Sequence, residues 1–380
     1  MPQRLSPNLH IGSAHATRVV FFLSGACVAA WAPLIPFVKD RFQLSDGRLG
    51  LLLLCMGIGS ILAMPLAGAL TGRWGCRRVI AGTLVIASAL LPLLTIVPRL
   101  ELLGACLLLF GATLGALDVA MNIHAVLVER AAGRSLMSGF HGLWSVGGIT
   151  GAGLVGLLVT LGTPLAFAAL AVTVLSLGLL GACIRSLLPE SADRGSPAFA
   201  WPHGRVILLG CLCCVLFLAE GSVMEWSAVF LSKERGMEVA HAGVGFVIFA
   251  TAMTLFRLAG DRLVRRVGPG RVVFLGGLCA ATGFVLAAAA PWIPAALAGF
   301  ALVGVGASNV VPVMFSAAGR QTSMPAHLAL PAMTTLGYAG SLAGPPLIGL
   351  VAQWSGLPVA FGLLGVLLAL VAVSSLAVRL

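Results

Sequence analysis

The sequence predicts an all-α membrane protein in which twelve transmembrane helices form two pseudo-symmetric six-helix bundles. Three observations lead to this fold class. Of the 380 residues, 59% are hydrophobic and only 9% are charged, which leaves too little polar surface to cover a soluble globule. The apolar stretches run for about 20 residues or more, the length of a helix that crosses the bilayer, and not for the shorter alternating segments of a membrane barrel. The second half of the chain also repeats the first.

The repeat is visible in the glycines, which recur at a fixed offset of 193 positions. The register holds without an insertion over more than a hundred residues of each half. Because each half is almost wholly apolar, the repeated unit is a set of membrane spans. The matching pairs are Gly50 and Gly243, Gly75 and Gly268, Gly111 and Gly304, Gly147 and Gly340, Gly151 and Gly344, and Gly156 and Gly349, together with Arg78-Val79 and Arg271-Val272.

Six spans are predicted in each half, each an apolar stretch that ends near an arginine, a proline or a polar turn. The longest polar interruption, from Leu188 to His203, joins the two halves and is too short to fold alone. We therefore expect an N-terminal six-helix bundle over 1–187, a cytoplasmic linker over 188–204 and a C-terminal six-helix bundle over 205–380. The predicted spans are 17–38, 47–72, 79–98, 101–128, 136–161, 164–187, 205–232, 240–265, 271–290, 292–318, 326–353 and 357–378.

The orientation follows from the lysines and arginines, which resist translocation across the membrane. With the N-terminus inside, sixteen of the 23 fall in inner loops or tails, six fall in outer loops, and Arg257 lies within a span. We therefore expect a multi-pass membrane protein with both termini cytoplasmic. The net charge of +11 reflects this topology and attraction to the lipid bilayer, so no nucleic-acid partner is expected. The six outer residues are Lys39, Arg41, Arg48, Arg99, Lys233 and Arg235.

The loop between spans 2 and 3 reads GALTGRWGCRR from Gly68 to Arg78. This loop, together with the two six-span copies and the short linker, resembles the major facilitator superfamily, whose signature is G-x-x-x-D-R-x-G-R-R. The matching positions are Gly68, Gly72, Arg73, Gly75, Arg77 and Arg78, with Gly72 in the place of the acidic residue. Four further segments resemble a poorly characterised bacterial inner-membrane branch related to the sugar (fucose) permeases: Asp118–Asn122, Phe140–Ser145, Glu225–Val229 and Asn309–Val313.

The resemblance implies a monomeric secondary active transporter, in which two bundles rock about a central site and expose it to each side in turn. Its partners would be a small-molecule substrate and, as in many members, protons; no enzymatic activity, cofactor or metal is expected. We favour a sugar or related polar metabolite as substrate. The alternatives are proton-driven export of drugs or amphipathic compounds and, more remotely, a non-transporting membrane receptor or scaffold. ATP drive is disfavoured because a Walker loop needs a lysine, and lysine occurs only at Lys39 and Lys233, outside such a loop.

Proton coupling requires ionisable side chains deep in the membrane, where each is costly and calls for an explanation. Asp118 is the leading candidate, near the middle of span 4, with Asn122 four residues on and on the same helical face. Glu220 lies midway along span 7, whereas Glu225 lies nearer its outer end and about 140° around the helix, so we expect only one of them to line the path. His141, at the start of span 5, is a further candidate. A purely structural hydrogen bond is the alternative role for each.

Other polar and aromatic side chains within the spans are candidates for the substrate cavity or for a gate. Arg257 and Asp261 lie one turn apart in span 8, so they can neutralise one another and form a cytoplasmic gate or simply fix the following loop. The glycines of spans 5 and 11, such as Gly147 and Gly340, have the spacing of close helix contacts. The cavity candidates are Asn122, Asn309, Tyr338, Trp31, Trp144 and Glu225.

Overall fold

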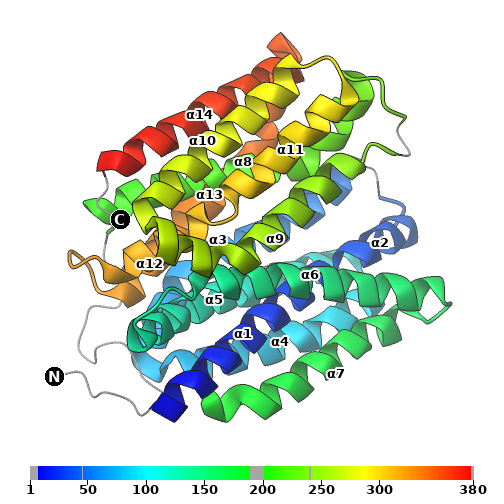
Figure 1. The fold of residues 1–380 in the computed structure, drawn as a ribbon. Helices are drawn as coiled ribbons and strands as arrows, with labels where there is room; N and C mark the ends of the chain where they lie inside the picture. The colour runs from blue at the N-terminus through cyan, green and yellow to red at the C-terminus, as the bar shows by residue number, and fades with distance from the viewer. Residues whose placement is uncertain (1–6, 45, 189–200, 239–240, 378–380) are drawn as a thin grey trace. The chain divides into compact units, whose positions relative to one another are not determined.

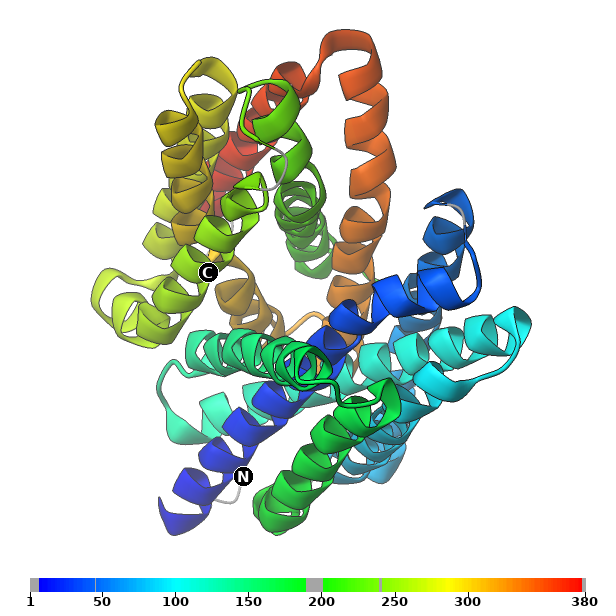
Figure 2. The same cartoon turned by 90° about the vertical axis from the view of Figure 1, so that its right-hand side faces the viewer.

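The computed structural model describes residues 7–44, 46–188, 201–238 and 241–377, and these ranges consist of helices and their connections, with no strand (Figures 1 and 2). Twelve segments of the described residues are long and apolar enough to cross a membrane, as predicted, and most of their ends lie within a few residues of the expected limits. The helices are α1 (Pro7–Ala30), η1 (Ala32–Leu34), α2 (Ile35–Arg41), α3 (Asp46–Trp74), α4 (Cys76–Ile96), α5 (Leu100–Ala132), α6 (Met137–Thr160), α7 (Leu165–Cys183), η2 (Ile184–Ser186), α8 (Arg205–Lys233), α9 (Val244–Val267), α10 (Pro269–Ala289), α11 (Ile293–Ala307), α12 (Val310–Arg320), α13 (Ala326–Ser355) and α14 (Leu357–Ala377).

The tenth span is broken in the middle, whereas a continuous helix is expected over 292–318. Helix α11 ends at Ala307 and α12 begins at Val310, so Ser308 and Asn309 lie between the two. Pro312, four residues after Ser308, has no N–H to donate to the Ser308 carbonyl, so the helical hydrogen-bond pattern is interrupted at this point. The Ser308 hydroxyl donates to the carbonyl of Val305 at 2.6 Å, a local side-chain bond that competes with the helical pattern of the backbone. The break lies next to the polar cluster of the candidate site.

The chain folds as two compact units. The first comprises Met1–Arg134, Leu143–Trp201 and Met324–Pro331, and the second comprises Ser135–Gly142, Pro202–Ser323 and Ala332–Leu380. The first turns of α6 therefore pack in the second unit, and the start of α13 packs in the first. The division otherwise falls between the halves of the internal repeat.

In the first unit, α5 is the central helix and packs against α1, α3 and α4, while α7 packs against α1 and α4 (Figure 1). In the second unit, α10 lies between α11 and α14, and α8 packs against α9, α12 and α14. An aromatic cluster fills this second core: the ring of Phe361 lies 4.8 Å from Phe230, 5.5 Å from Phe284 and 6.0 Å from Phe300, measured between centroids. Each ring is fully buried. Rings at these distances and tilts stabilise a core beyond simple burial.

The two copies share backbone details at the predicted offset. Gly75, before α4, has φ 81° and ψ 152°, and Gly268, before α10, has φ 90° and ψ 148°. Gln43 and Gly236, also 193 positions apart, both have positive φ, at 49° and 72°. Residues with a Cβ rarely adopt positive φ, which favours glycine at three of these four positions, and Gln43 is the exception. The repeat seen in the sequence is a repeat of structure.

Two of the arginines that are predicted to lie in outer loops, Arg41 and Arg235, bind the ends of helices. Arg41 donates from Nη1 to the Thr95 carbonyl at 2.6 Å and from Nη2 to the Val97 carbonyl at 2.7 Å, at the C-terminal end of α4. Arg235 donates from Nη2 to the carbonyls of Ala287 and Ala288, both at 2.8 Å, at the end of α10. A cation that binds the last carbonyls of a helix satisfies them and complements the helix dipole.

We expect Arg41→Ala to lower the free energy of unfolding by about 1 kcal/mol, because exposed charge–dipole contacts contribute on that scale. Arg235→Ala should have a similar effect, since it holds the equivalent helix end. Thermal unfolding of the purified protein in detergent measures both. An unchanged melting temperature in both variants would contradict this capping role.

Candidate functional site

Asp118 lies within α5, the central helix of the first unit. Its side chain points away from the exposed face of that helix. Measured around α5, it lies about 80–180° from the exposed side chains of Ala105, Leu108 and Leu109. Its neighbours in the sequence are buried, yet Asp118 keeps partial exposure. Asn122 Nδ2 donates to the carboxylate Oδ1 at 3.3 Å and to the Asp118 carbonyl at 2.8 Å. The predicted shared face of Asp118 and Asn122 is thus present, and Asn122 itself is fully buried.

The two acids of α8 lie on different sides of that helix. Glu220 lies about 120–180° around the helix from the exposed side chains of Leu208 and Cys211, whereas Glu225 lies about 40° from Cys211 and is itself exposed. The side chain of Glu220 is 20% exposed, and its carboxylate forms an ion pair in which Oε1 lies 3.5 Å from Nη2 of Arg257. Only Glu220 therefore faces the interior of the second unit.

Arg257 forms an ion pair with Glu220 on another helix, a contact that the predicted pairing with Asp261 on its own helix does not indicate. The guanidinium also donates from Nε to the Ser308 carbonyl at 3.2 Å, at the break in the tenth span. Next to it, Asn309 Nδ2 donates to the Phe256 carbonyl at 3.1 Å. Glu220, Arg257 and Asn309 thus form one polar cluster from α8, α9 and the α11–α12 break, which spacing along the sequence does not reveal.

Asp261 holds the beginning of α6. Its Oδ2 accepts a hydrogen bond from the backbone N–H of Gly139 at 3.1 Å, in the part of α6 that belongs to the second unit. One turn on, Arg265 Nη1 donates to the Ser135 carbonyl at 3.3 Å. A carboxylate at the first turn of a helix satisfies an N–H that has no helical partner and complements the helix dipole.

The equivalent position in the first copy is Gly68, 193 positions before Asp261, and it makes contact by a different means. A Cβ added at Gly68 would lie 2.5 Å from the His327 carbonyl oxygen and 2.7 Å from Pro331 Cγ, at the start of α13. Gly72, in the place of the family's acid, faces the His327 ring, with Cδ2 3.5 Å from an added Cβ. The first copy therefore uses close packing where the second uses a charged hydrogen bond.

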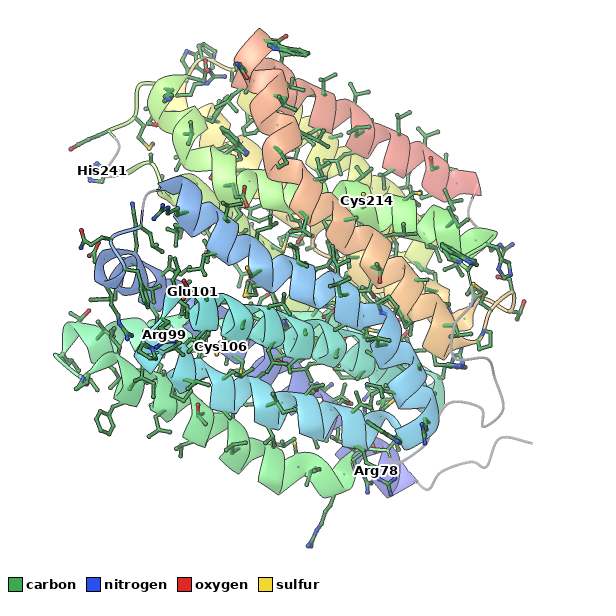
Figure 3. The ribbon with its side chains drawn as sticks, turned by 180° about the vertical axis from the view of Figure 1, so that it is seen from behind. Arg78, Arg99, Glu101, Cys106, Cys214 and His241 are labelled. Atoms are coloured by element: carbon green, nitrogen blue, oxygen red, sulfur yellow. The ribbon has the colours of Figure 1, made fainter. Side chains whose placement is uncertain are left out.

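The rest of the signature loop anchors the end of the first copy. Arg77 donates from Nε to the Leu187 carbonyl at 2.8 Å and from Nη2 to the Arg185 carbonyl at 3.1 Å. Arg73 and Arg78 are exposed. Figure 3 shows Arg78 at one end of the first unit and Arg99 at the other, as expected for the two ends of a helix that spans the membrane.

His124 has a clear structural role that the sequence analysis weighs lightly. Its Nε2 accepts from the backbone N–H of Leu188 at 2.9 Å, so its Nδ1 carries the proton and donates to the Thr17 hydroxyl at 3.1 Å. Thr17 in turn donates to the Ser13 carbonyl at 2.7 Å. His124 is fully buried and fastens the chain after η2 to α1. The only sequence signal is a histidine near a helix end, which is too common to single out.

The remaining candidates are His141, Tyr338, Trp144 and Trp31. The His141 ring lies 5.5 Å from that of Phe315 between centroids and interacts electrostatically with Arg257, which adds it to the second-unit cluster. Tyr338 meets Phe217 of α8 edge-on at 5.6 Å. Trp144 contributes its carbonyl to the contact with Gly25 of α1. Trp31 is buried, and its Nε1 has no hydrogen-bond partner among the described residues.

Comparison with known proteins identifies the family of this chain. The family model described as Major Facilitator Superfamily matches residues 19–329 and 209–380. The chain belongs to the Major Facilitator Superfamily. An uncharacterized MFS-type transporter of Yersinia pestis is 53% identical over 364 residues, covering 96% of this chain and 95% of the relative. The uncharacterized transporter y4wD of Sinorhizobium fredii is 33% identical over 357 residues, covering 93% and 94%. The resemblance drawn from the motifs is confirmed, and this MFS protein is a transporter and not an enzyme.

Solved structures give the same fold. The MFS transporter FucP in its outward conformation superposes with a TM-score of 0.82 at 16% identity, covering 97% of this chain and 99% of FucP. The proton:xylose symporter XylE superposes with a TM-score of 0.74 at 13% identity, covering 97% and 95%. At these identities the likeness establishes the MFS fold of this chain.

Proposed function

We propose that this MFS transporter moves a small polar metabolite, a sugar or a related compound, by alternating access coupled to protons. It would act as a monomer in the bacterial inner membrane, with both termini in the cytoplasm. The observation that carries this proposal is the buried polar cluster of the second unit, in which Glu220 and Arg257 form an ion pair beside the break in the tenth span. Buried ionisable pairs next to a discontinuous helix are typical of coupling sites in transporters.

The first unit supports a second ionisable site at Asp118. Asp118 faces away from the exposed face of α5 and is itself partly exposed, so its carboxyl group can exchange a proton with water. Its bond from Asn122 supplies an amide that could also meet a substrate hydroxyl. We propose Asp118 and Glu220 as the proton-coupling residues, with His141 beside the second, and Asn122, Asn309, Tyr338, Trp31 and Trp144 as substrate contacts.

The choice of a polar substrate draws on two kinds of support. The buried Nε1 of Trp31 and the buried Oδ1 of Asn309 lack hydrogen-bond partners among the described residues, and polar groups of a ligand or water could satisfy them. Of the proteins with the same fold, FucP of E. coli is a fucose:proton symporter and XylE is a proton:xylose symporter.

We further propose that the contacts at the starts of α6 and α13 act as the cytoplasmic gate. Asp261 holds α6 through the Gly139 N–H, and Gly68 lies against the start of α13. Each contact joins two segments of the same compact unit, next to a place where the chain passes to the other unit. Glu225, exposed on the other side of α8, is assigned to the outer vestibule.

Transport by purified protein in liposomes tests the proposal. With an inward proton gradient, we expect uptake of at least one labelled monosaccharide from a panel that includes fucose and xylose, and collapse of that uptake by a protonophore. Counterflow should persist without the gradient. Protonophore-sensitive efflux of a fluorescent amphipathic dye, with no sugar uptake, would favour the exporter instead. Absence of both sugar uptake and dye efflux would refute the proposed function.

A further inference from the structure

Three exposed arginines lie where α9 passes into α10 in the second unit. Arg262 and Arg266 are on the last two turns of α9, and Arg271 is on the first turn of α10. Within the described part of the chain, none of the three has an ion-pair partner. The one carboxylate of these two helices is Asp261, and its Oδ2 accepts from the Gly139 N–H. Three positive charges therefore lie together without a described counterion.

The face of α9 that carries two of these arginines is apolar further along the helix. Leu255 is exposed and lies within about 20° of both Arg262 and Arg266 around the helix. The side of α9 that contacts other helices of the second unit carries Arg257 and Gly260, about 140–160° away from Leu255. The arginines thus end an exposed apolar stripe that points away from the packed side of α9.

The neighbouring helix has the same pattern. Helix α10 contacts α9, and a turn at Gly268 joins the two. On α10, Leu275 and Leu278 are exposed and lie within about 40° of Arg271. The first N–H groups of α10 have no partner within the helix, and the positive end of the helix dipole lies there. Both helices therefore present an apolar stripe that ends in positive charge at the same turn.

The first copy lacks part of this patch. Arg73 and Arg78 are the equivalents of Arg266 and Arg271 at the offset of 193, and both are exposed. The equivalent of Arg262 is Ala69, however, so the first copy has two exposed arginines in place of three. Its additional arginine, Arg77, is bound to the carbonyls of Leu187 and Arg185. The patch without described partners is therefore larger in the second copy.

We propose that Arg262, Arg266 and Arg271 bind the headgroup of an anionic phospholipid from the surrounding bilayer. The arginines lie at the ends of two apolar spans, Val244–Val267 and Pro269–Ala289, which is the level of the lipid phosphates. Guanidinium groups form paired hydrogen bonds with phosphate oxygens, and a net negative headgroup adds to this attraction. The acyl chains would lie along the stripes that carry Leu255 on α9 and Leu275 on α10. This inference does not depend on the proposed transport activity.

Native mass spectrometry of the full-length protein in detergent tests the lipid preference. The lipids are phosphatidylglycerol, which is anionic, and phosphatidylcholine, which has no net charge, with the same acyl chains. We expect the wild type to bind phosphatidylglycerol about a hundredfold more tightly, because each basic residue near an anionic surface contributes about a factor of five. Arg266→Gln/Arg271→Gln should bind phosphatidylglycerol about 25-fold more weakly. Arg99→Gln/Lys233→Gln removes the same charge at two exposed residues elsewhere and should leave this affinity unchanged.

A photoactivatable phosphatidylglycerol locates the site in the wild type. We expect the labelled peptides to come mainly from residues 255–278. Should the double arginine variant fail to elute as a folded protein, Arg271→Gln alone should weaken binding about fivefold. Inorganic phosphate, added at the ionic strength of a chloride control, should not displace the lipid.

Any of four results would overturn this inference. They are equal affinity of the wild type for the two lipids, labelling that lies mainly outside 255–278, equal losses in the two double variants, and displacement of the lipid by inorganic phosphate. The last would indicate a site for a soluble anion. Uptake in liposomes judges the proposed function separately, so a protein that transports without preferring phosphatidylglycerol refutes this inference alone.

Discussion

Replacement of Asp118 by asparagine is expected to abolish proton-driven transport while leaving the protein folded. The change removes the ionisable group and keeps the size and hydrogen-bonding capacity of the side chain, so the contact with Asn122 can persist. If Asp118 carries the proton, uptake under an inward proton gradient should fall to the level of empty liposomes. Counterflow, which needs no net proton movement, should continue.

Asp40→Asn is the matched control, because it makes the same chemical change at an exposed residue of α2. We expect this variant to transport like the wild type. Size-exclusion chromatography and thermal unfolding should show that both variants fold. Full gradient-driven uptake by Asp118→Asn would remove Asp118 from the proton path and leave Glu220 as the remaining carboxylate of the proposed pair.

Gly147→Ala is expected to destabilise the protein strongly, because α6 and α1 touch at this glycine. A Cβ at Gly147 would overlap the backbone carbonyl of Phe22, and one at Gly151, a turn later, would overlap that of Ala26. Backbone cannot move aside as a flexible side chain can, so the two helices must separate. Overpacking of this kind costs about 1–3 kcal/mol. Thermal unfolding in detergent should show a clear fall in melting temperature.

Gly153→Ala provides the control on the same helix. No atom lies within 4 Å of a Cβ added at Gly153, which is exposed. Since alanine favours a helix over glycine by up to about 1 kcal/mol in soluble hosts, this variant should be neutral or slightly more stable. Equal losses of stability at Gly147 and Gly153 would mean that helix propensity, and not close contact, explains these glycines.

The contact role of the glycines is thus one feature that the sequence predicts correctly, and the repeat shows why. Gly111 meets the Met56 carbonyl and Gly304 meets the Phe249 carbonyl, and both members of these two pairs are 193 positions apart. Small residues at a regular spacing can be recognised in the sequence alone, because they allow the backbone of another helix to approach closely. It does not say which helix comes near.

Buried charges behave differently, since their partners depend on the fold. The spacing of Arg257 and Asp261 predicts a pair within one helix, but it does not indicate that Arg257 pairs with Glu220 on α8 or that Asp261 accepts from the Gly139 N–H on α6. Arg41 is another example, because the carbonyls that it binds at the end of α4 lie more than fifty residues away in the sequence. No pattern along the chain encodes which of several polar groups will meet across helices.

The sequence by itself determined that this chain is a twelve-span membrane protein built from two copies of one unit, because hydrocarbon thickness sets the length of a span and a glycine pattern survives in the primary order of residues. Only the tertiary structure decided where the tenth span breaks, which helix holds Asp261 and how Glu220, Arg257 and Ser308 come together. The physical reason is that a buried polar group takes whichever partner packing brings within about 3 Å, and that distance is fixed by helices far apart in the chain.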